Sequence, residues 1–154
     1  MQIELVRATV ADAQELWLMQ KEGFAALLEK YQDFESNPAA ESIDKTILRL
    51  QQPYRDFYFI VADGRNVGAI SVRTAPDGWK KLGPLWVLPA YQGRGIAQEA
   101  IRLVEELHGA DKWALDTILQ EKGNCHLYEK LGYRQTGATH VVNERTTLVD
   151  YVKE

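Results

Sequence analysis

The chain has 154 residues, of which 45% are hydrophobic and 26% are charged, and its formal net charge is −4. This composition is that of an ordinary globular protein, and the length predicts a single domain over residues 1–154 with a hydrophobic core. The negative charge argues against a general attraction to nucleic acid or to anionic membranes, so a bound polyanion would have to meet a local cationic pocket.

The first third of the chain predicts one strand and two helices. Alternating residues at 3–7 predict the strand. Thr9, with Asp12 three residues later, predicts the capped start of a helix, which apolar residues at helical spacing continue. Asn37-Pro38 predicts the start of a second helix, because proline suits the first turn of a helix.

The middle of the chain predicts antiparallel strands. Residues 57–62 and 67–72 predict two strands, and the Gly-containing turn at 63–66 joins them into a hairpin. After a Pro-Asp-Gly turn at 76–78, we expect another strand from about residue 81 to 88.

The second half of the chain predicts helices alternating with strands. A long amphipathic helix follows Gly93 and ends at Gly109. The remaining expected elements are a strand at 113–118, a short helix at 124–131, and closing strands at 133–139 and 145–152. This order of elements predicts a mixed α/β fold, in which antiparallel hairpins feed one central strand–helix–strand unit.

The junction before the long helix is the most informative part of the sequence. It reads Gln92-Gly93-Arg94-Gly95-Ile96-Ala97 and lies between a predicted strand and a predicted helix. Glycines let backbone N–H groups approach an anion, and the start of a helix adds unpaired donors and a favourable dipole. The segment therefore predicts a site for phosphate oxygens.

A dinucleotide-binding module is one alternative for this segment. Gly93-x-Gly95, followed by Asp116 about twenty residues later, imitates the dinucleotide fingerprint. Against it, the sixth position is Gln98 rather than glycine. The unit also lies after antiparallel hairpins rather than at the start of a doubly wound sheet, which disfavours NAD binding.

The segment 92–97 resembles the Q/R-x-x-G-x-G/A signature of the GNAT superfamily of N-acetyltransferases. The strand before it, with Val87 and Pro89, and the later run Leu127-Tyr128-Glu129-Lys130-Leu131-Gly132-Tyr133 resemble the flanking motifs of that family. The resemblance is strongest over residues 82–137. It implies a mixed, mostly antiparallel sheet of six to seven strands with about four helices and a central β-α-β coenzyme-binding unit.

The resemblance also implies an activity. Members of the family move an acetyl group from acetyl-CoA to a primary amine by direct attack. The acceptor would be a small molecule or the N-terminus of a peptide or protein, and the sequence identifies neither the acceptor nor the length of the acyl chain. A non-catalytic acyl-CoA sensor or interaction domain with the same fold is the alternative.

The resemblance places the coenzyme along the strand end and the glycine loop. The pyrophosphate would rest on backbone N–H groups of the loop, and Arg94 would add charge at its rim. A β-bulge near Leu85-Trp86-Val87 would free backbone groups for the pantetheine amides, and the N–H of Val87 would hold the thioester carbonyl. The predicted coenzyme contacts are Leu85, Trp86, Val87, Gln92, Gly93, Arg94, Gly95, Ile96, Ala97, Gln98 and Asn124. For Asn124, the alternative is a helix cap.

Two residues are predicted to be catalytic. By resemblance, Tyr128 lies near the coenzyme sulfur and protonates the departing thiolate, and the alternative is a packed aromatic side chain. Asp116 matches a position where some relatives carry an acid, and it would act as general base unless loop N–H groups bind it. Two departures from the family stand out. Residues 80–86 carry no acid, where many relatives have one, and Glu121 stands where relatives often have asparagine.

The acceptor is expected over the first two helices and the tip of the last hairpin. Aromatic side chains available there are Phe24, Tyr31, Phe34, Tyr54 and Tyr58, and acidic ones are Glu29, Asp33, Glu35 and Glu41. The acidic residues would favour a cationic amine, unless they form an ordinary solvated helix face.

The remaining expectations concern metal, location and assembly. The single cysteine, Cys125, precludes an internal disulfide and a sulfur-rich metal site. The histidines add no metal pair, since His126 does not face its neighbour Cys125 on a helix, His108 lies late in a helix and His140 is expected in a turn. With no long apolar run and no signal-peptide layout at the start, we expect a cytoplasmic protein, monomeric or homodimeric through strands of the C-terminal hairpin.

Overall fold

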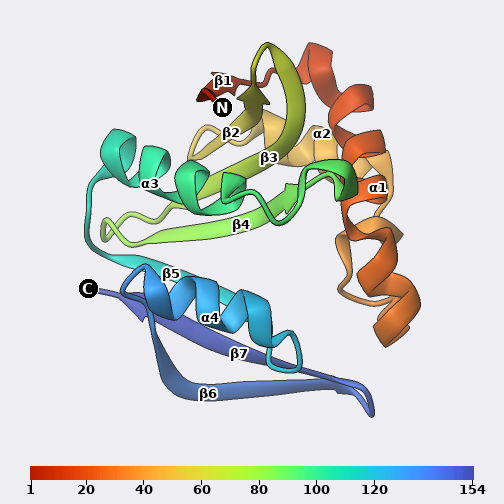
Figure 1. Cartoon of the computed structure of the whole chain (residues 1–154), viewed down its shortest axis with the longest axis vertical. Coiled ribbons are helices and arrows are strands. Elements are labelled where there is room, and N and C mark those ends of the chain that lie inside the picture. The colour runs from red at the N-terminus through yellow and green to blue at the C-terminus, as the bar shows by residue number, and fades with distance from the viewer.

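The computed structural model describes all 154 residues and contains one seven-stranded sheet with four helices (Figure 1). The strands follow the order β1 (Ile3–Arg7), β2 (Arg55–Ala62), β3 (Arg65–Thr74), β4 (Lys80–Val87), β5 (Trp113–Ile118), β7 (Thr146–Lys153) and β6 (Arg134–Asn143). All neighbouring strands are antiparallel except β4 and β5, which are parallel. The predicted mixed, mostly antiparallel fold is confirmed.

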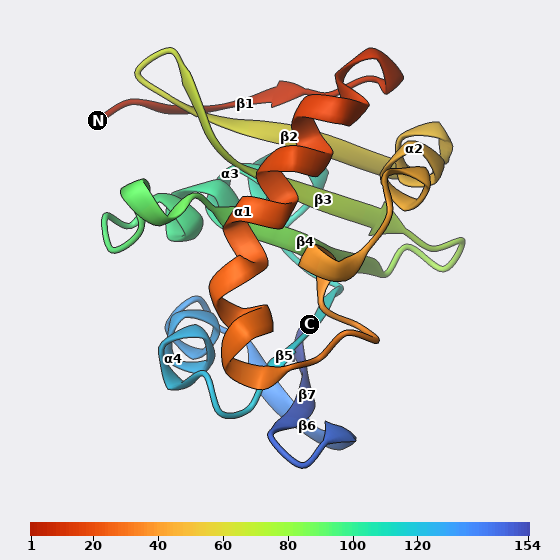
Figure 2. The ribbon, with the colours of Figure 1, turned by 90° about the vertical axis from the view of Figure 1, so that its right-hand side faces the viewer.

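The helices cover both faces of the sheet. They are α1 (Ala13–Tyr31), α2 (Ile43–Gln51), α3 (Ile96–His108) and α4 (Lys122–Lys130). In Figure 2, α1 and α2 lie in front of β2, β3 and β4, and α3 lies behind them. No helix is both long and apolar enough to cross a membrane.

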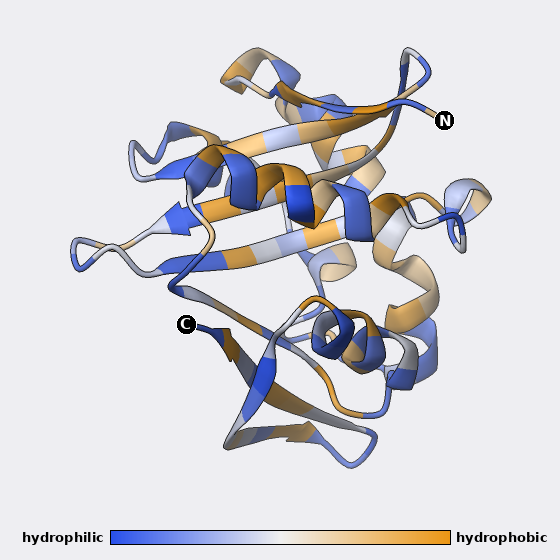
Figure 3. Cartoon of the chain, turned by 60° about the vertical axis from the view of Figure 1, so that its left-hand side comes forward, coloured by the Kyte–Doolittle hydropathy of each residue, from blue (hydrophilic) through white to orange (hydrophobic).

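Strand β2 shows why the sheet is buried on both faces. Its residues Tyr58, Ile60 and Ala62 pack in the larger core with α3, whereas Phe57 and Phe59 pack with α1 in the smaller core. A strand covered on both sides is apolar at nearly every position rather than at alternate ones. In Figure 3, most of the hydrophobic colour lies within the helices and strands, and the turns that join neighbouring strands are hydrophilic.

The structure corrects two local predictions and confirms two others. The Thr9–Asp12 capping box is present, and Gly109 ends α3. Asn37, however, caps only the short 3₁₀ turn Pro38–Ala40, because the backbone returns to the extended region at Glu41, and α2 begins at Ile43. His140 was expected in a turn but lies within β6, paired with Leu148.

Strands β4 and β5 separate soon after they meet. Only Lys80 and Lys81 pair with β5. On its other side, β4 pairs with β3 through Leu82 and Leu85 opposite Val72 and Ile70, so one extra residue of β4 is accommodated at 83–84. The bulge predicted at residues 85–87 therefore lies at Gly83-Pro84, where Gly83 has a positive φ of 133°. Beyond this point, the facing edges of β4 and β5 are free.

Candidate active site

The loop between β4 and α3 presents a row of unpaired backbone donors. Gly93 and Gly95 have φ values of 76° and 77°, a conformation that side chains other than glycine disfavour. None of the N–H groups of residues 93–98 has a hydrogen-bond partner within the chain, and the next donor, Glu99 N–H, bonds to the Gly95 carbonyl at 3.1 Å. A Cβ added at either glycine would meet no atom within 4 Å. The loop is thus an open anion cradle at the start of a 13-residue helix.

Two side chains of the loop have structural contacts. The Arg94 guanidinium lies over the Tyr91 ring, 5.6 Å from its centroid, and remains exposed at the rim. Gln92 Nε2 donates to the Val87 carbonyl at 2.9 Å. The Gln92 side chain therefore ties the loop to the end of β4, and the coenzyme contact expected for Gln92 stays a prediction.

The free edge of β4 carries the second set of unpaired groups. N–H groups alternate between the two sides of a strand, and the N–H of Leu88 donates to Val67 beside β3 at 2.8 Å. The N–H groups of Val87 and Leu85 consequently point to the opposite side, into the gap between β4 and β5.

Trp86 does not belong to this free edge. Its backbone is paired with Ala69 of β3, and its indole is buried beneath α1. Gly23 makes room for the indole, because a Cβ at Gly23 would lie 2.6 Å from Trp86 Cδ1. Alternation along the strand thus directs the indole of Trp86 into the core, and the coenzyme contact expected for Trp86 stays a prediction that this burial does not support.

A cavity of about 460 Å³ lies beside the gap and is lined by residues of α1 and α2 as well as of β4 and β5. Its wall includes residues 82–85 of β4, residues 116–118 of β5, and Asn124 and Tyr128 of α4. The cavity thus brings together both predicted catalytic residues and the bulged part of β4.

Tyr128 combines a packed ring with a free hydroxyl. Its ring lies 6.0 Å from that of Tyr133 and 6.2 Å from that of Tyr151, centroid to centroid. Burial, and after it the charge of Asp116, raises the pKa of the Tyr128 phenol to about 12. The hydroxyl makes no hydrogen bond within the chain, although the residue lines the cavity. It is therefore a protonated donor whose proton is available to a ligand.

Asn124 lies one helical turn before Tyr128 and lines the same cavity. The alternative of a helix cap is wrong, because α4 begins at Lys122 with Glu121 at the N-cap position. Glu121 itself accepts hydrogen bonds from the Tyr31 hydroxyl and, at 2.8 Å, from Lys30 Nζ. The acid that stands where relatives often have asparagine thus ties the end of α1 to the start of α4.

Asp116 projects into the cavity from β5. Its carboxylate lies 3.3 Å from Lys81 Nζ and accepts no hydrogen bond from a loop N–H group. Directly across the β5–β7 pair stands Asp150. Asp116 is thus a partly exposed carboxylate with one cationic neighbour, on the same cavity wall as Tyr128.

Comparison with known families identifies this architecture. Residues 19–133 match the model described as "Acetyltransferase (GNAT) family". The chain belongs to the GNAT family of acetyltransferases. A search of the curated proteins by sequence gives no match.

Solved structures share the whole GNAT fold at low sequence identity. An acetyltransferase from Thermus thermophilus is 16% identical, with a TM-score of 0.73, covering 98% of this chain and 96% of its own. The PaiA N-acetyltransferase from Thermoplasma acidophilum, in complex with coenzyme A, is 19% identical, with a TM-score of 0.73 and full coverage of both chains. The microcin C7 self-immunity acetyltransferase MccE, in complex with acetyl-CoA and AMP, is 17% identical, with a TM-score of 0.74, covering 97% and 91%.

The aromatic residues expected to hold the acceptor of this GNAT protein mostly lie elsewhere. Only Phe24 lines the cavity. Tyr31 is buried against Glu121, and Tyr58 is buried with its hydroxyl 2.9 Å from His108 Nε2. Phe34 and Tyr54 are exposed and outside the cavity. The spacing of aromatic residues in the sequence did not indicate which face each would occupy.

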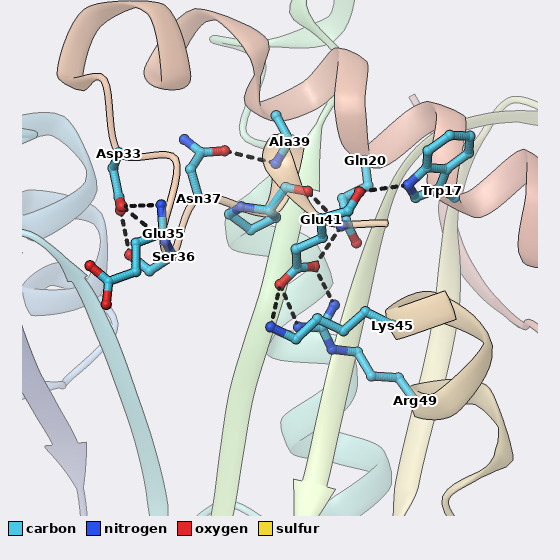
Figure 4. Close-up of polar contacts among 11 residues, drawn as sticks. Trp17, Gln20, Asp33, Glu35, Ser36, Asn37, Ala39, Glu41, Lys45 and Arg49 are labelled. Atoms are coloured by element: carbon cyan, nitrogen blue, oxygen red, sulfur yellow. Dashed lines mark hydrogen bonds and ion pairs between the residues drawn. The ribbon is translucent and has the colours of Figure 1, made fainter. Parts of the chain in front are cut away.

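The acidic residues near the cavity are largely engaged by their own neighbours. Asp33 accepts from the N–H groups of Ser36 and Glu35 at 2.9 and 3.2 Å, which stabilises the turn after α1. In Figure 4, Lys45 and Arg49 of α2 converge on the Glu41 carboxylate. Arg49 makes two hydrogen bonds to Glu41, at 2.6 and 2.9 Å, and Lys45 lies 3.4 Å from it.

Three of the four acidic residues expected near the acceptor, Asp33, Glu35 and Glu41, line the cavity, and the preference for a cationic amine stays a prediction. Glu29 does not line the cavity, and the exposed carboxylate of Glu35 points away from the Glu41 cluster in Figure 4. The cations of the cavity wall, which were not identified from the sequence, come from α2 and three strands. They are Lys45, Arg49, Arg55, Arg73 and Lys81.

Proposed function

We propose that this protein transfers an acetyl group from acetyl-CoA to a primary amine of a small molecule or peptide by direct attack. The observation that carries the proposal is the continuity of the site. Unpaired N–H groups at residues 93–98 lie at the end of a strand whose free edge leads to the cavity containing Tyr128. A phosphate cradle, an exposed strand edge and a proton donor in this order match the pyrophosphate, the amide-bearing arm and the thioester of acetyl-CoA.

The loop and the strand edge would hold and polarise the donor. The N–H groups of residues 93–98 bind the pyrophosphate at the positive end of the α3 dipole. Backbone groups of Leu85 pair with an amide of the pantetheine arm. The N–H of Val87 donates to the thioester carbonyl and stabilises the negative charge that develops there when the amine attacks. One such donor is typically worth about 10²- to 10³-fold in rate.

Tyr128 and Asp116 would move the two protons of the reaction. The amine nitrogen forms a bond to the acetyl carbon, the carbon–sulfur bond breaks, and Tyr128 gives its proton to the departing thiolate. Asp116 accepts the proton that the amine loses, through a water molecule, and its carboxylate lies 3.3 Å from Lys81 Nζ. Gain and loss of protons balance, and the products are the acetylated amine and coenzyme A.

Binding and turnover measurements test the proposal separately. Thermal shift and calorimetry with acetyl-CoA, coenzyme A and NAD should show stabilisation by the first two. Stabilisation by NAD alone would exclude an acetyl-CoA site. Release of coenzyme A should then be followed over a panel of amines, peptides and aminoglycosides. Tight acetyl-CoA binding without turnover of any acceptor would favour the non-catalytic sensor instead.

We also propose that the transferred group is acetyl, that residues 1–154 act as a single unit, and that the protein is cytoplasmic and either monomeric or homodimeric.

A further inference from the structure

Five cations and four carboxylates line the cavity, and one of the carboxylates, the exposed Glu35, has no ion-pair partner in the structure. Glu41 is paired with Arg49 and Lys45, and Asp116 is paired with Lys81. Asp33 is engaged in its own turn. The cavity wall also contains Arg55 and Arg73, and neither has a carboxylate within ion-pair distance.

The register of the sheet places these cations in one row. Arg55 of β2 stands directly opposite Arg73 of β3, and Arg73 stands directly opposite Lys81 of β4. Directly opposed residues project from the same face, with Cβ atoms about 5 Å apart, and like charges at such positions destabilise a sheet. Three adjacent strands thus carry a destabilising row of positive charge, and all three residues line the cavity.

Arg55 is held in place by neutral groups. Its Nη1 donates to Ser71 Oγ at 2.8 Å and to the Gly83 carbonyl at 3.2 Å, and its Nε donates to Gln52 Oε1 at 2.9 Å. Its Nη2 has no hydrogen-bond partner in the chain. Burial, followed by the charges of Arg49 and Arg73, lowers the pKa of Arg55 to about 10. A fixed guanidinium with free donors and cationic neighbours is a ready partner for an oxyanion.

We propose that the row formed by Arg55, Arg73 and Lys81 binds an oxyanion group, a carboxylate or a phosphate, on the acceptor. This inference rests on the proposed acetyl transfer, since it concerns the second substrate of the same cavity. The acceptor is then an amine that also carries an anionic group, such as an amino acid or an aminoalkyl phosphate. Diamines and polyamines are disfavoured, because their second ammonium group would face the row.

A matched series of acceptors tests the substrate class. At saturating acetyl-CoA, turnover is compared among ω-amino acids, their carboxamides, diamines of equal chain length, and aminoalkyl phosphates. We expect the better of the two anionic series to exceed the carboxamides by about 10- to 100-fold in kcat/KM, the usual worth of one charged hydrogen bond. Which of the two anionic series reacts faster shows whether the row binds a carboxylate or a phosphate. Equal or better turnover of the diamines would overturn the inference.

Arg73→Gln tests the row with little risk to folding, because Arg73 is exposed and makes no hydrogen bond or ion pair in the structure. It should remove most of the preference for the anionic acceptor and leave the KM for acetyl-CoA unchanged. Arg65→Gln is the matched control, an exposed arginine at the other end of β3, and it should change neither value. An unchanged preference in Arg73→Gln would overturn the inference.

Binding of acetylated products separates this inference from the proposed function. With coenzyme A bound, calorimetry compares N-acetyl ω-amino acids and N-acetyl aminoalkyl phosphates with the matching N-acetyl carboxamides. Tighter binding of an anionic product that is lost in Arg73→Gln would support an oxyanion site at the row. If no amine is turned over in the same experiments, the proposed acetyl transfer fails, but the oxyanion site is still supported. Turnover of amines with no advantage of either anionic product over the carboxamide would sink the inference and keep the proposed function.

Discussion

The proposed coenzyme loop and the proposed acceptor row present their hydrogen-bond donors in different ways. The loop offers backbone N–H groups of six consecutive residues, 93–98, and its conformation depends on two glycines. The row offers side chains from three strands, whose residues lie far apart in the sequence. On this proposal, donor recognition is encoded locally in the sequence, whereas acceptor recognition arises only when the sheet assembles.

The largest effect is expected from Gly95→Trp in the loop. The substitution places an indole over the N–H groups that would hold the pyrophosphate, so coenzyme A binding should be abolished. A Cβ at Gly95 meets no atom within 4 Å, so the cost to folding is that of a positive φ, about 1–2 kcal/mol. Calorimetry with coenzyme A measures the loss.

Gly64→Trp is the control for this substitution. Gly64 has a φ of 82° in the β2–β3 turn, and a Cβ there also meets no atom within 4 Å. The two variants should therefore lose similar stability in thermal unfolding, while only Gly95→Trp loses coenzyme A. Equal affinity of Gly95→Trp and Gly64→Trp for coenzyme A would show that the loop does not bind the coenzyme.

Local signals explain what could be predicted of the fold. The capping box at Thr9, the glycine that ends α3 and the alternation in the hairpin each act within a few residues, and the elements built on them are confirmed. The start of α2 was wrong because Asn37-Pro38 begins a 3₁₀ turn equally well. Extended backbone at Glu41 and Ser42 separates that turn from the helix.

The same distinction explains the candidate site. The loop was found because glycines and a helix start are adjacent in the sequence. The orientation of Trp86 could not be predicted from the sequence, because the side of β4 on which each backbone group lies depends on its pairing with β3. The cationic row was missed because the predicted hairpin ended at Val72, one residue before Arg73, and only the extended strands bring Arg73 opposite Arg55.

Tyr128→Phe tests whether the Tyr128 hydroxyl gives its proton to the departing thiolate of coenzyme A. It keeps the packed ring and deletes the hydroxyl, so kcat should fall by about 10²- to 10³-fold with little change in coenzyme affinity. Because the pKa of Tyr128 is raised to about 12, the wild-type hydroxyl stays protonated, and kcat should not decline on the alkaline side before that region. Steady-state kinetics across pH measure both features.

Tyr133→Phe provides the comparison for Tyr128. It removes a hydroxyl from the same aromatic group, but one that donates to Glu105 at 3.1 Å. It should cost about 1 kcal/mol of stability and leave kcat unchanged. Unaltered turnover in Tyr128→Phe would show that Tyr128 is a packed aromatic side chain without a catalytic role.

A smaller loss of kcat is expected from Asp116→Asn. Asp116 lies in the cavity wall beside Lys81 of the row. If its carboxylate accepts the amine proton through water, kcat should fall by up to about 100-fold, with coenzyme affinity unchanged. Asp150→Asn is the matched control, since Asp150 stands opposite Asp116 on β7 but does not line the cavity. Equal kinetics of the two variants would exclude Asp116 as the base.

The smallest effect on turnover is expected from Glu41→Gln, which changes the acceptor wall without touching the row. Burial alone would raise the pKa of Glu41, but the hydrogen bonds and charge of Arg49 outweigh it and lower the pKa. The folded-state pKa therefore lies below the unfolded one, so this stabilisation is present at neutral pH and is lost as the pH falls below about 4. Glu41→Gln should cost about 2 kcal/mol in denaturant unfolding at neutral pH.

The cost of Glu41→Gln should shrink in acid, where the wild-type carboxylate is itself protonated. Because the substitution leaves Arg49 and Lys45 without their carboxylate, the wall becomes more positive. Affinity for an anionic acceptor should then rise a few-fold, while that for coenzyme A stays constant, since the loop binds through backbone groups. A parallel change in both affinities would show that the two regions are not independent, and that the donor also depends on the charged side chains of α2.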